Sequence, residues 1–273
     1  MCFAAPARYS LNGLVIAVDG ARGTVTISHD AIAGYMDAMT MAFRVRDVAE
    51  TSRVHPGDRA SFTLVVDRQS SWVENLRVIP FESPARDPAL ASRLRLLDSV
   101  VGKAPAASIG IGQAVPDFTL TDQGNRPVSL SGFRGKVVAL NFIYTRCPLP
   151  DYCFRLSNNF GRLQKRFSSR KDLMLLTVTF DPVHDRPDVL ARYARTWKAD
   201  PSMWRFLTGA LPDIDRVCEM FGVARWQDDG LFTHSLHTVV IDRAGKVVAN
   251  IEGNTFTAGQ LGDLVEAALA GRR

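Results

Sequence analysis

The stretch 136-KVVALNFIYTRCPLPDYCFRLS-157 decides the fold of the second half of the chain. Its first part, residues 136–144, is a continuous apolar run, which is typical of a strand buried on both faces of a sheet. Beyond the prolines, apolar side chains recur at steps of three and four, which predicts a helix with Asp151 as N-cap. Cys153 then lies in the first turn of this helix, and Cys147 lies in the loop before it.

The position of this cysteine pair favours chemistry over packing. A loop between a buried parallel strand and a helix is a usual functional position in α/β folds, and the helix dipole stabilises a thiolate there. A regular helix would separate the two Cα atoms by roughly 9 Å, which exceeds the limit of about 7 Å for a disulfide. A looped segment must therefore bring the sulfurs together. A redox pair and a metal site both remain open.

The rest of the second half alternates strands and helices. The pattern predicts a buried strand at 172–180, followed by helices at 187–197 and 211–222. It also predicts a hairpin with its turn at 242–245 and a last helix at 257–270, capped by Thr257. This order predicts that residues 113–273 form an α/β domain with a thioredoxin-like fold.

The first part of the chain has a different pattern. Residues 9–80 read as short alternating strands separated by turns, which predicts a small all-β barrel or sandwich. Residues 81–112 are rich in Pro, Ala and Gly and are expected to be a linker, with one amphipathic helix at 87–101.

Composition limits the partners. The chain has 273 residues, 46% hydrophobic and 22% charged, with a formal charge of +5, as in soluble globular proteins. It lacks a Lys/Arg block of the kind that follows nucleic acid and an apolar run of about 18 residues. No nucleic-acid partner and no small-molecule substrate are expected. The opening MCFAAPARYS is too short for an export signal, so none is visible.

Four segments resemble the Sco/SenC family of copper proteins, which have a thioredoxin-like fold. They are PDFTLTDQG, VALNFIYTRCP, TFDPVHDRPDVL and FTHSLHTVVIDRAGKV, and the match covers most of residues 113–270. The resemblance implies a copper site made by Cys147, Cys153 and His234. Such a set suits Cu(I), and an added oxygen ligand would suit Cu(II). This chain departs from the family in separating its cysteines by five residues rather than three, and in having Phe154 where proline is common.

Other residues near these segments have alternative roles. In one strand His234 and His237 would point to opposite faces, so at most one can join the cysteines. Asp181 matches a family carboxylate and would orient a ligand or supply an oxygen; a turn that ends the strand is the equal alternative. Zinc competes with copper for such ligands. Cys218 is expected to fill the core.

A second set of soft donors lies in 27-ISHDAIAGYMDAMTMAF-43. Met39 and Met41 share a face on a strand, and thioether sulfur selects Cu(I), although a methionine pair is usually core filling. The segment resembles the CusF-like family of OB-type copper-binding barrels over about residues 10–79. The resemblance implies ligands at His29, Met39 and Met41. Met36 stands where the family carries a tryptophan and would be a fourth ligand or a lid.

Together these resemblances imply a copper metallochaperone rather than an enzyme. Its client would be the binuclear copper centre in the copper subunit of cytochrome c oxidase, or another copper protein. The alternatives are a thiol–disulfide oxidoreductase, with Cys147 and Cys153 as the redox pair, and a copper-resistance buffer. Two features argue against the oxidoreductase. The chain lacks the C-x-x-C spacing usual in disulfide exchange, and the segment 231-LFTHS-235 has a histidine where thioredoxin-type proteins have a proline. A periplasmic or cell-envelope location is expected, with membrane anchoring in the full precursor.

Overall fold

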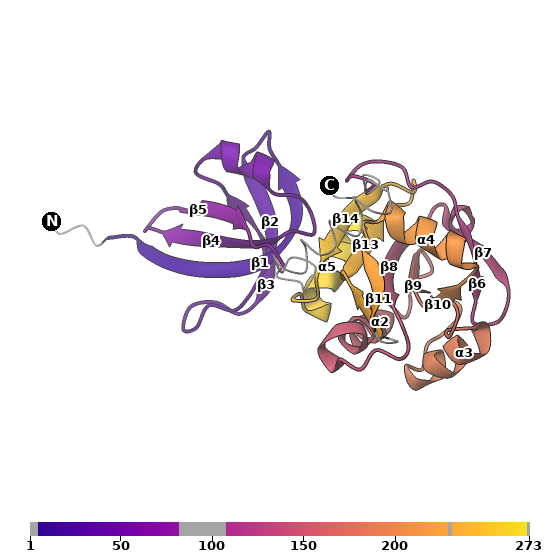
Figure 1. The fold of residues 1–273 in the computed structure, drawn as a ribbon. Helices are drawn as coiled ribbons and strands as arrows, with labels where there is room; N and C mark the ends of the chain where they lie inside the picture. Colours follow the sequence, from indigo (N-terminus) through magenta and orange to yellow (C-terminus); the bar gives the residue numbers. More distant parts are fainter. Residues whose placement is uncertain (1–4, 82–107, 229–230, 272–273) are drawn as a thin grey trace, which may run out of the picture. The chain divides into compact units, whose positions relative to one another are not determined.

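A computed structural model of the chain describes residues 5–81, 108–228 and 231–271 (Figure 1). Contacts divide the chain into two compact units, Met1–Pro80 with Gly259–Arg273, and Phe81–Ala258. The helix expected at 87–101 lies outside the described residues. The domain boundaries inferred from the sequence stay a prediction.

The first unit is built on one antiparallel sheet with the strand order β3-β2-β1-β4-β5. Its strands are β1 (Ala7–Asp19), β2 (Thr24–His29), β3 (Met39–Arg44), β4 (Arg59–Val66) and β5 (Ser71–Val78). A 3₁₀ turn, η1 (Val48–Arg53), connects β3 to β4, and helix α5 (Ala258–Leu269) completes the unit.

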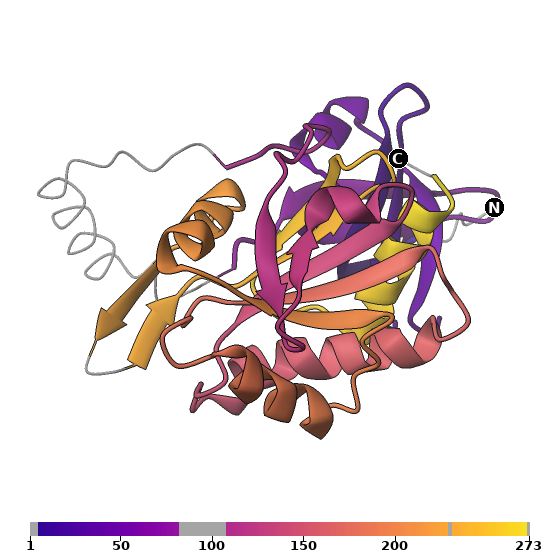
Figure 2. The same cartoon turned by 90° about the vertical axis from the view of Figure 1, so that its right-hand side faces the viewer.

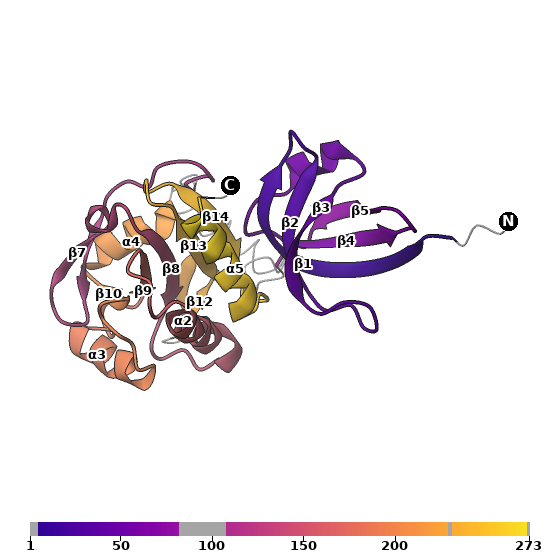
Figure 3. The same ribbon diagram turned by 180° about the vertical axis from the view of Figure 1, so that it is seen from behind.

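Alternating side chains bury one face of this sheet around Val15, Ile27 and Phe62, because successive residues of a strand point to opposite faces. A bulge between Val15 and Ala17 bends the long strand β1. The edge strands meet through a single bridge between Val45 and Val73. The all-β prediction is confirmed, with the barrel left open between β3 and β5 (Figure 3).

The second unit contains a mixed sheet with the order β14-β13-β8-β9-β10-β6-β7. Its strands are β6 (Thr119–Asp122), β7 (Pro127–Ser129), β8 (Val137–Ile143), β9 (Leu173–Thr179), β10 (Trp204–Thr208), β13 (His237–Ile241) and β14 (Val247–Glu252). A separate two-stranded sheet joins β11 (Arg225–Asp228) to β12 (Leu231–His234). Strands β8, β9 and β10 are parallel, and every residue of β8 and β9 is buried, as the apolar runs predicted.

Helices cover both faces of this sheet (Figures 1 and 2). Helices α2 (Arg155–Arg166) and α3 (Pro187–Thr196) lie on one side, and α4 (Leu211–Met220) lies on the other. A 3₁₀ turn, η3 (Leu130–Phe133), follows β7, and a π-helical turn, η4 (Pro150–Phe154), precedes α2. No helix in the described ranges is both long and apolar enough to cross a membrane.

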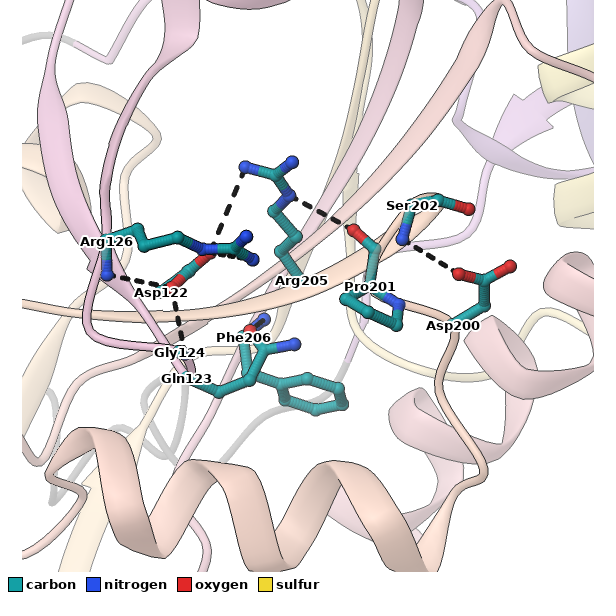
Figure 4. A network of polar contacts seen from close by, with 9 residues as sticks. All are labelled: Asp122, Gln123, Gly124, Arg126, Asp200, Pro201, Ser202, Arg205 and Phe206. Atoms are coloured by element: carbon teal, nitrogen blue, oxygen red, sulfur yellow. Dashed lines mark hydrogen bonds and ion pairs between the residues drawn. The ribbon is translucent and has the colours of Figure 1, made fainter.

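A buried carboxylate fixes the edge of the sheet at β6 and β7 (Figure 4). Asp122 has no exposed surface and accepts hydrogen bonds from the amides of Gly124 (2.8 Å) and Arg126 (3.0 Å). The Arg126 guanidinium also binds this carboxylate, at 3.0 Å. Gln123 ties this edge to β10 by accepting the Phe206 amide at 2.9 Å.

Candidate metal centre

Two cysteines lie at the carboxyl end of β8, as predicted. Cys147 is half-buried on the loop, whereas Cys153 lies in η4 with only 1% of its surface exposed. A π-turn holds more residues than an α-turn and is frequent at functional sites, so η4 accommodates the long cysteine spacing. The expected N-cap at Asp151 is wrong: the cap residue is Leu149, whose side chain makes no capping hydrogen bond.

His234 lies at the end of β12 and faces the buried cysteine. Only 6% of its surface is exposed, and its Nε2 is 3.9 Å from Cys153 Sγ. Its Nδ1 is 2.9 Å from the Ser235 carbonyl oxygen, which can only accept. In the neutral imidazole Nδ1 therefore carries the proton, and the lone pair of Nε2 points to the cysteine, as metal-binding histidines require.

The spacing of these donors suits a shared metal ion. Two ligands on one ion, with bonds of about 2.3 Å to sulfur and about 2.0 Å to nitrogen, lie roughly 3.6–3.8 Å apart. The 3.9 Å between Cys153 and His234 is close to this separation. The part of the chain that the structure describes holds no three His, Cys, Asp or Glu side chains already grouped for a metal ion. Cys153 and His234 are thus in contact, and Cys147 lies close enough to interact with both.

The two thiols have opposite acidities. A hydrogen bond from Cys153 lowers the pKa of Cys147 to about 4, against the effect of burial, and His234 adds to the lowering. Desolvation raises the pKa of Cys153 well above its ordinary value. The accessible sulfur is thus a thiolate at neutral pH, ready to bind a soft metal or attack a disulfide.

Aromatic rings exclude water around the histidine. The His234 ring lies 4.4 Å from the Phe180 ring and 5.9 Å from that of Tyr144, between ring centroids. Phe232 closes the cluster, 5.5 Å from both Phe180 and Tyr144. Burial raises the pKa of Tyr144 to about 12, and the charge of Cys147 adds to the effect.

The other histidine has a structural role. His237 belongs to β13, a strand separate from that of His234, so the expectation that both share one strand is wrong. Its Nδ1 lies 2.9 Å from Asn250 Oδ1, and Asn250 in turn donates to the Phe221 carbonyl. The choice of His234 rests on its contact with Cys153 rather than on strand alternation.

The predicted carboxylate acts beside the centre. Asp181 follows β9, and its side chain is only 5% exposed and bound to Arg146 at 2.7 Å. Arg146 directly precedes Cys147. This ion pair therefore connects the end of β9 to residues 144–154, which carry both cysteines and are called the cysteine loop below. A direct role of Asp181 as an oxygen ligand stays a prediction.

The sequence analysis missed Asp185. This carboxylate has no exposed surface and accepts hydrogen bonds from the Thr145 amide (3.0 Å), the Thr145 hydroxyl (2.5 Å) and the Thr179 hydroxyl (2.6 Å). Desolvation raises its pKa, against these hydrogen bonds. Its position four residues after Asp181, in the same quoted segment, was the available signal. Cys218, which was expected to fill the core, is buried, and burial raises its pKa to about 12.

The first unit brings the other predicted donors to one end of the β2–β3 hairpin. His29 and Met39 are direct cross-strand partners, which places their Cβ atoms about 4.5–5.5 Å apart on the same face. Met41, two residues along β3, shares that face and packs partly against the core. Met39 is 49% exposed, so this cluster opens to solvent.

His29 has the same orientation device as His234. Its Nδ1 lies 2.8 Å from the carbonyl oxygen of Asp30, the next residue, which fixes the proton on Nδ1. Its Nε2 is buried and has no hydrogen-bond partner among the described residues. An unpaired buried nitrogen is costly, and a soft metal ion would satisfy it. Met36 is half-buried in the loop after β2, held by backbone hydrogen bonds with Ile32.

Family models match both units. The SCO1/SenC model matches residues 107–269, and the model of the copper-binding periplasmic protein CusF matches residues 8–78. A SCO1 protein homolog of Bacillus subtilis is 30% identical over 96 residues, which are 35% of this chain and 49% of that protein. The chain thus spans about half the length of this relative.

Solved structures show the same fold. A SCO1/SenC family lipoprotein from Bacillus anthracis is 24% identical, with a TM-score of 0.53 over 60% of this chain and 99% of its own. BsSco, described as a Sco cytochrome c oxidase assembly protein with a disulfide switch, is 24% identical at a TM-score of 0.51 over 59% and 97%. Copper-bound ScoI of Arabidopsis thaliana is 20% identical at 0.51 over 58% and 99%.

These likenesses confirm the thioredoxin-like fold of the second unit and the resemblance of the first unit to CusF. The family model of the second unit covers more than half of the chain, from the entry hairpin through the cysteine loop to the last helix. The chain belongs to the SCO1/SenC family, and a CusF-type copper-binding domain precedes its Sco domain.

Proposed function

We propose that this chain is a copper metallochaperone with two soft metal sites. The second unit binds Cu(I) through Cys147, Cys153 and His234. The 3.9 Å contact between Cys153 Sγ and the unprotonated Nε2 of His234 carries this proposal. Two sulfurs and one imidazole favour Cu(I) over harder ions, and an added oxygen ligand would admit Cu(II).

The first unit binds a second Cu(I) through His29, Met39 and Met41. Thioethers need no deprotonation and form no disulfides, so they serve where thiols are oxidised. Transfer from this site to the thiolate site by ligand exchange follows from having both sites on one chain, which raises their effective concentration. Loss of both Met39 and Met41 then slows copper loading of the second site; unchanged loading contradicts the transfer step.

The client is the binuclear copper centre of cytochrome c oxidase, or the copper site of another protein. Support for the oxidase comes from the Sco neighbour described as an oxidase assembly protein. A cell-envelope location is supported by the periplasmic CusF model and by the lipoprotein among the structural neighbours. Membrane anchoring of the full precursor belongs to the same proposal.

An anaerobic Cu(I) titration against a competing chelator tests the two sites. The reduced chain is compared with a Cys147→Ala/Cys153→Ala variant and a Met39→Leu/Met41→Leu variant. Two equivalents for the wild type and one for each variant support two separate sites. An unchanged stoichiometry without the cysteines overturns the Sco-type site. Tight binding of both ions with no transfer to any acceptor favours a copper-resistance buffer.

Thiol–disulfide exchange is a second candidate function, favoured by the low pKa of Cys147 beside the buried Cys153 thiol. The Cys147 thiolate attacks a client disulfide and displaces one client thiolate. Cys153, after losing its proton, attacks the mixed disulfide and releases the second. The chain is oxidised to a disulfide and the client is reduced to a dithiol. Reduction of a model disulfide that requires both cysteines, but not His234, supports this function over copper delivery.

A further inference from the structure

One side of the second unit carries an unbalanced positive charge next to the cysteines. Residues 152–171 contain six basic side chains and no Asp or Glu: Arg155, Arg162, Lys165, Arg166, Arg170 and Lys171. Helix α3 adds Arg195 in its last turn, and Lys198 follows just after the helix ends. The one acidic residue of α3, Asp188, is bound by Arg192 at 3.0 Å and Arg186 at 3.6 Å.

Five of these cations form what we call the basic face: Arg155, Arg162, Lys165, Arg195 and Lys198. All five are exposed, and none makes an ion pair with the residues that the structure describes. A solvated helix surface ordinarily mixes both signs of charge. Asp151 and Asp200 are exposed acidic neighbours in sequence, so the basic face carries an excess of positive charge rather than positive charge alone. Such an excess attracts partners of the opposite sign and raises their rate of encounter.

Side-chain contacts place the two helices of the basic face side by side (Figures 1 and 3). Ser157 Oγ lies 2.9 Å from the Tyr193 hydroxyl, and Gln164 donates to the Lys198 carbonyl at 3.1 Å. Helix α2 begins two residues after Cys153 and is about 18 Å long. A protein partner in an ordinary interface covers about 800 Å² of surface. An area of this size can include both α2 and the segment that carries the cysteines.

Exposed apolar side chains lie between the basic face and Cys147. Leu149 is 50% exposed and Phe154 is 57% exposed. The Phe154 ring packs 4.8 Å from that of Trp197, which links the cysteine loop to α3. Apolar residues at the centre with charged residues around them are the usual anatomy of a protein interface.

We propose that the basic face, with Leu149 and Phe154 at its inner edge, docks the acidic surface of a protein that exchanges copper at Cys147. This inference rests on the proposed function and names the chemistry of the partner. An acidic protein fits better than an anionic lipid surface, because the partner must bring copper ligands to Cys147, and the face flanks that residue directly.

Two synthetic peptides with the same pair of Cu(I)-binding cysteines test the proposal, one flanked by glutamates and one by glutamines. Fluorescence anisotropy measures docking of each copper-free peptide, and stopped-flow measures Cu(I) transfer from the reduced, loaded full chain at several ionic strengths. The wild type is expected to bind the glutamate peptide and to load it about tenfold faster than the glutamine peptide at low salt. This preference falls as salt rises.

The variants separate local from total charge. Arg162→Glu/Arg195→Glu is expected to abolish the preference for the glutamate peptide. The control Arg216→Glu/Lys246→Glu changes the net charge equally, but on α4 and on the turn between β13 and β14, and is expected to keep the preference within about twofold. Equal losses in both variants overturn the proposal.

Other outcomes are equally decisive. Transfer to both peptides at equal, salt-independent rates overturns the basic face and leaves the proposed function intact. Docking through the face without any transfer supports the face and contradicts the proposed function. Binding to phosphatidylglycerol vesicles that the Arg162→Glu/Arg195→Glu change abolishes, with peptide docking unchanged, overturns the proposal in favour of a lipid surface.

Discussion

The Asp185 carboxylate accepts hydrogen bonds from the amide of Thr145, at 3.0 Å, and from the hydroxyl of Thr145, at 2.5 Å. Thr145 lies two residues before Cys147. This carboxylate, fully buried after β9, therefore fixes the start of the cysteine loop after β8. The candidate metal centre therefore depends on a contact between the segments that follow two strands as well as on its own donors. Removing one partner of such a buried hydrogen bond lowers the stability of the fold, because the other partner is left unsatisfied.

Asp185→Asn is expected to lower both stability and copper affinity. The carboxylate accepts hydrogen bonds at both of its oxygens, whereas the asparagine amide has only one oxygen that can accept. The free energy of unfolding should fall by about 1–3 kcal/mol, and Cu(I) affinity should fall about tenfold. The control is Asp122→Asn, which removes a similarly buried acceptor at the far edge of the sheet. It should cost stability alone, measured by urea unfolding, and an equal loss of affinity would contradict the positioning role.

Alkylation of the reduced, copper-free chain reports the acidity of Cys147. Its pKa of about 4 predicts a reaction with iodoacetamide that is nearly independent of pH between about 5.5 and 8. Mass spectrometry should place the label on Cys147, because Cys153 is buried and its pKa is raised.

Cys153→Ala is the matched variant for this measurement. It removes the hydrogen bond that lowers the Cys147 pKa most, so the midpoint of the pH–rate profile should move upward by more than about one unit. A wild-type midpoint near 8.5, the ordinary value for cysteine, would show that the two thiols do not interact.

The parts that the sequence predicted are those with a local signal. Continuous apolar runs identified β8 and β9, and steps of three and four identified α2. This helix begins at Arg155, so Cys153 lies in the π-turn before it and not in its first turn as predicted. Strand β10 was missed, because its five residues, Trp204–Thr208, are too few to show a period. Its burial comes from β9 and β6 on either side, which no local pattern reveals.

The geometry of the site was predictable only in outline. The residue types Cys147, Cys153 and His234 were identified by resemblance, whereas the π-turn that brings them together was not. A π-turn has no sequence signature comparable to an N-cap. The clamp by Asp185 and the carbonyl contacts that fix both histidine rings depend on distances between side chains and backbone, which spacing alone does not give.

Replacing His234 should separate a ligand from a nearby structural histidine. His234→Ala removes the bare nitrogen that faces Cys153, and Cu(I) affinity of the second site should fall by at least about 100-fold, since even outer partners of ligands cost 10–100-fold. His237→Ala should lower stability, through its contact with Asn250, and leave affinity unchanged. Chelator competition at a fixed pH measures both, and equal affinities in the two variants would exclude His234 as a ligand.

Conservative replacement of the methionines tests the first unit with little change in packing. Met-to-Leu changes keep the volume of the side chain and usually cost less than about 1.5 kcal/mol, but they remove the thioether donor. Met39→Leu/Met41→Leu should therefore abolish one equivalent of Cu(I) and leave the midpoint of unfolding nearly unchanged.

Met36→Leu, in the same chain, distinguishes a fourth ligand from a lid. A ligand requires its sulfur, so this change would weaken Cu(I) binding at the first site, whereas a lid needs only an apolar side chain and would tolerate leucine. X-ray absorption at the copper edge of the Cys147→Ala/Cys153→Ala background counts the sulfur ligands directly. We expect two sulfurs and one nitrogen when Met36 is a lid, and a third sulfur when it binds. A first coordination sphere without sulfur would contradict the methionine site itself.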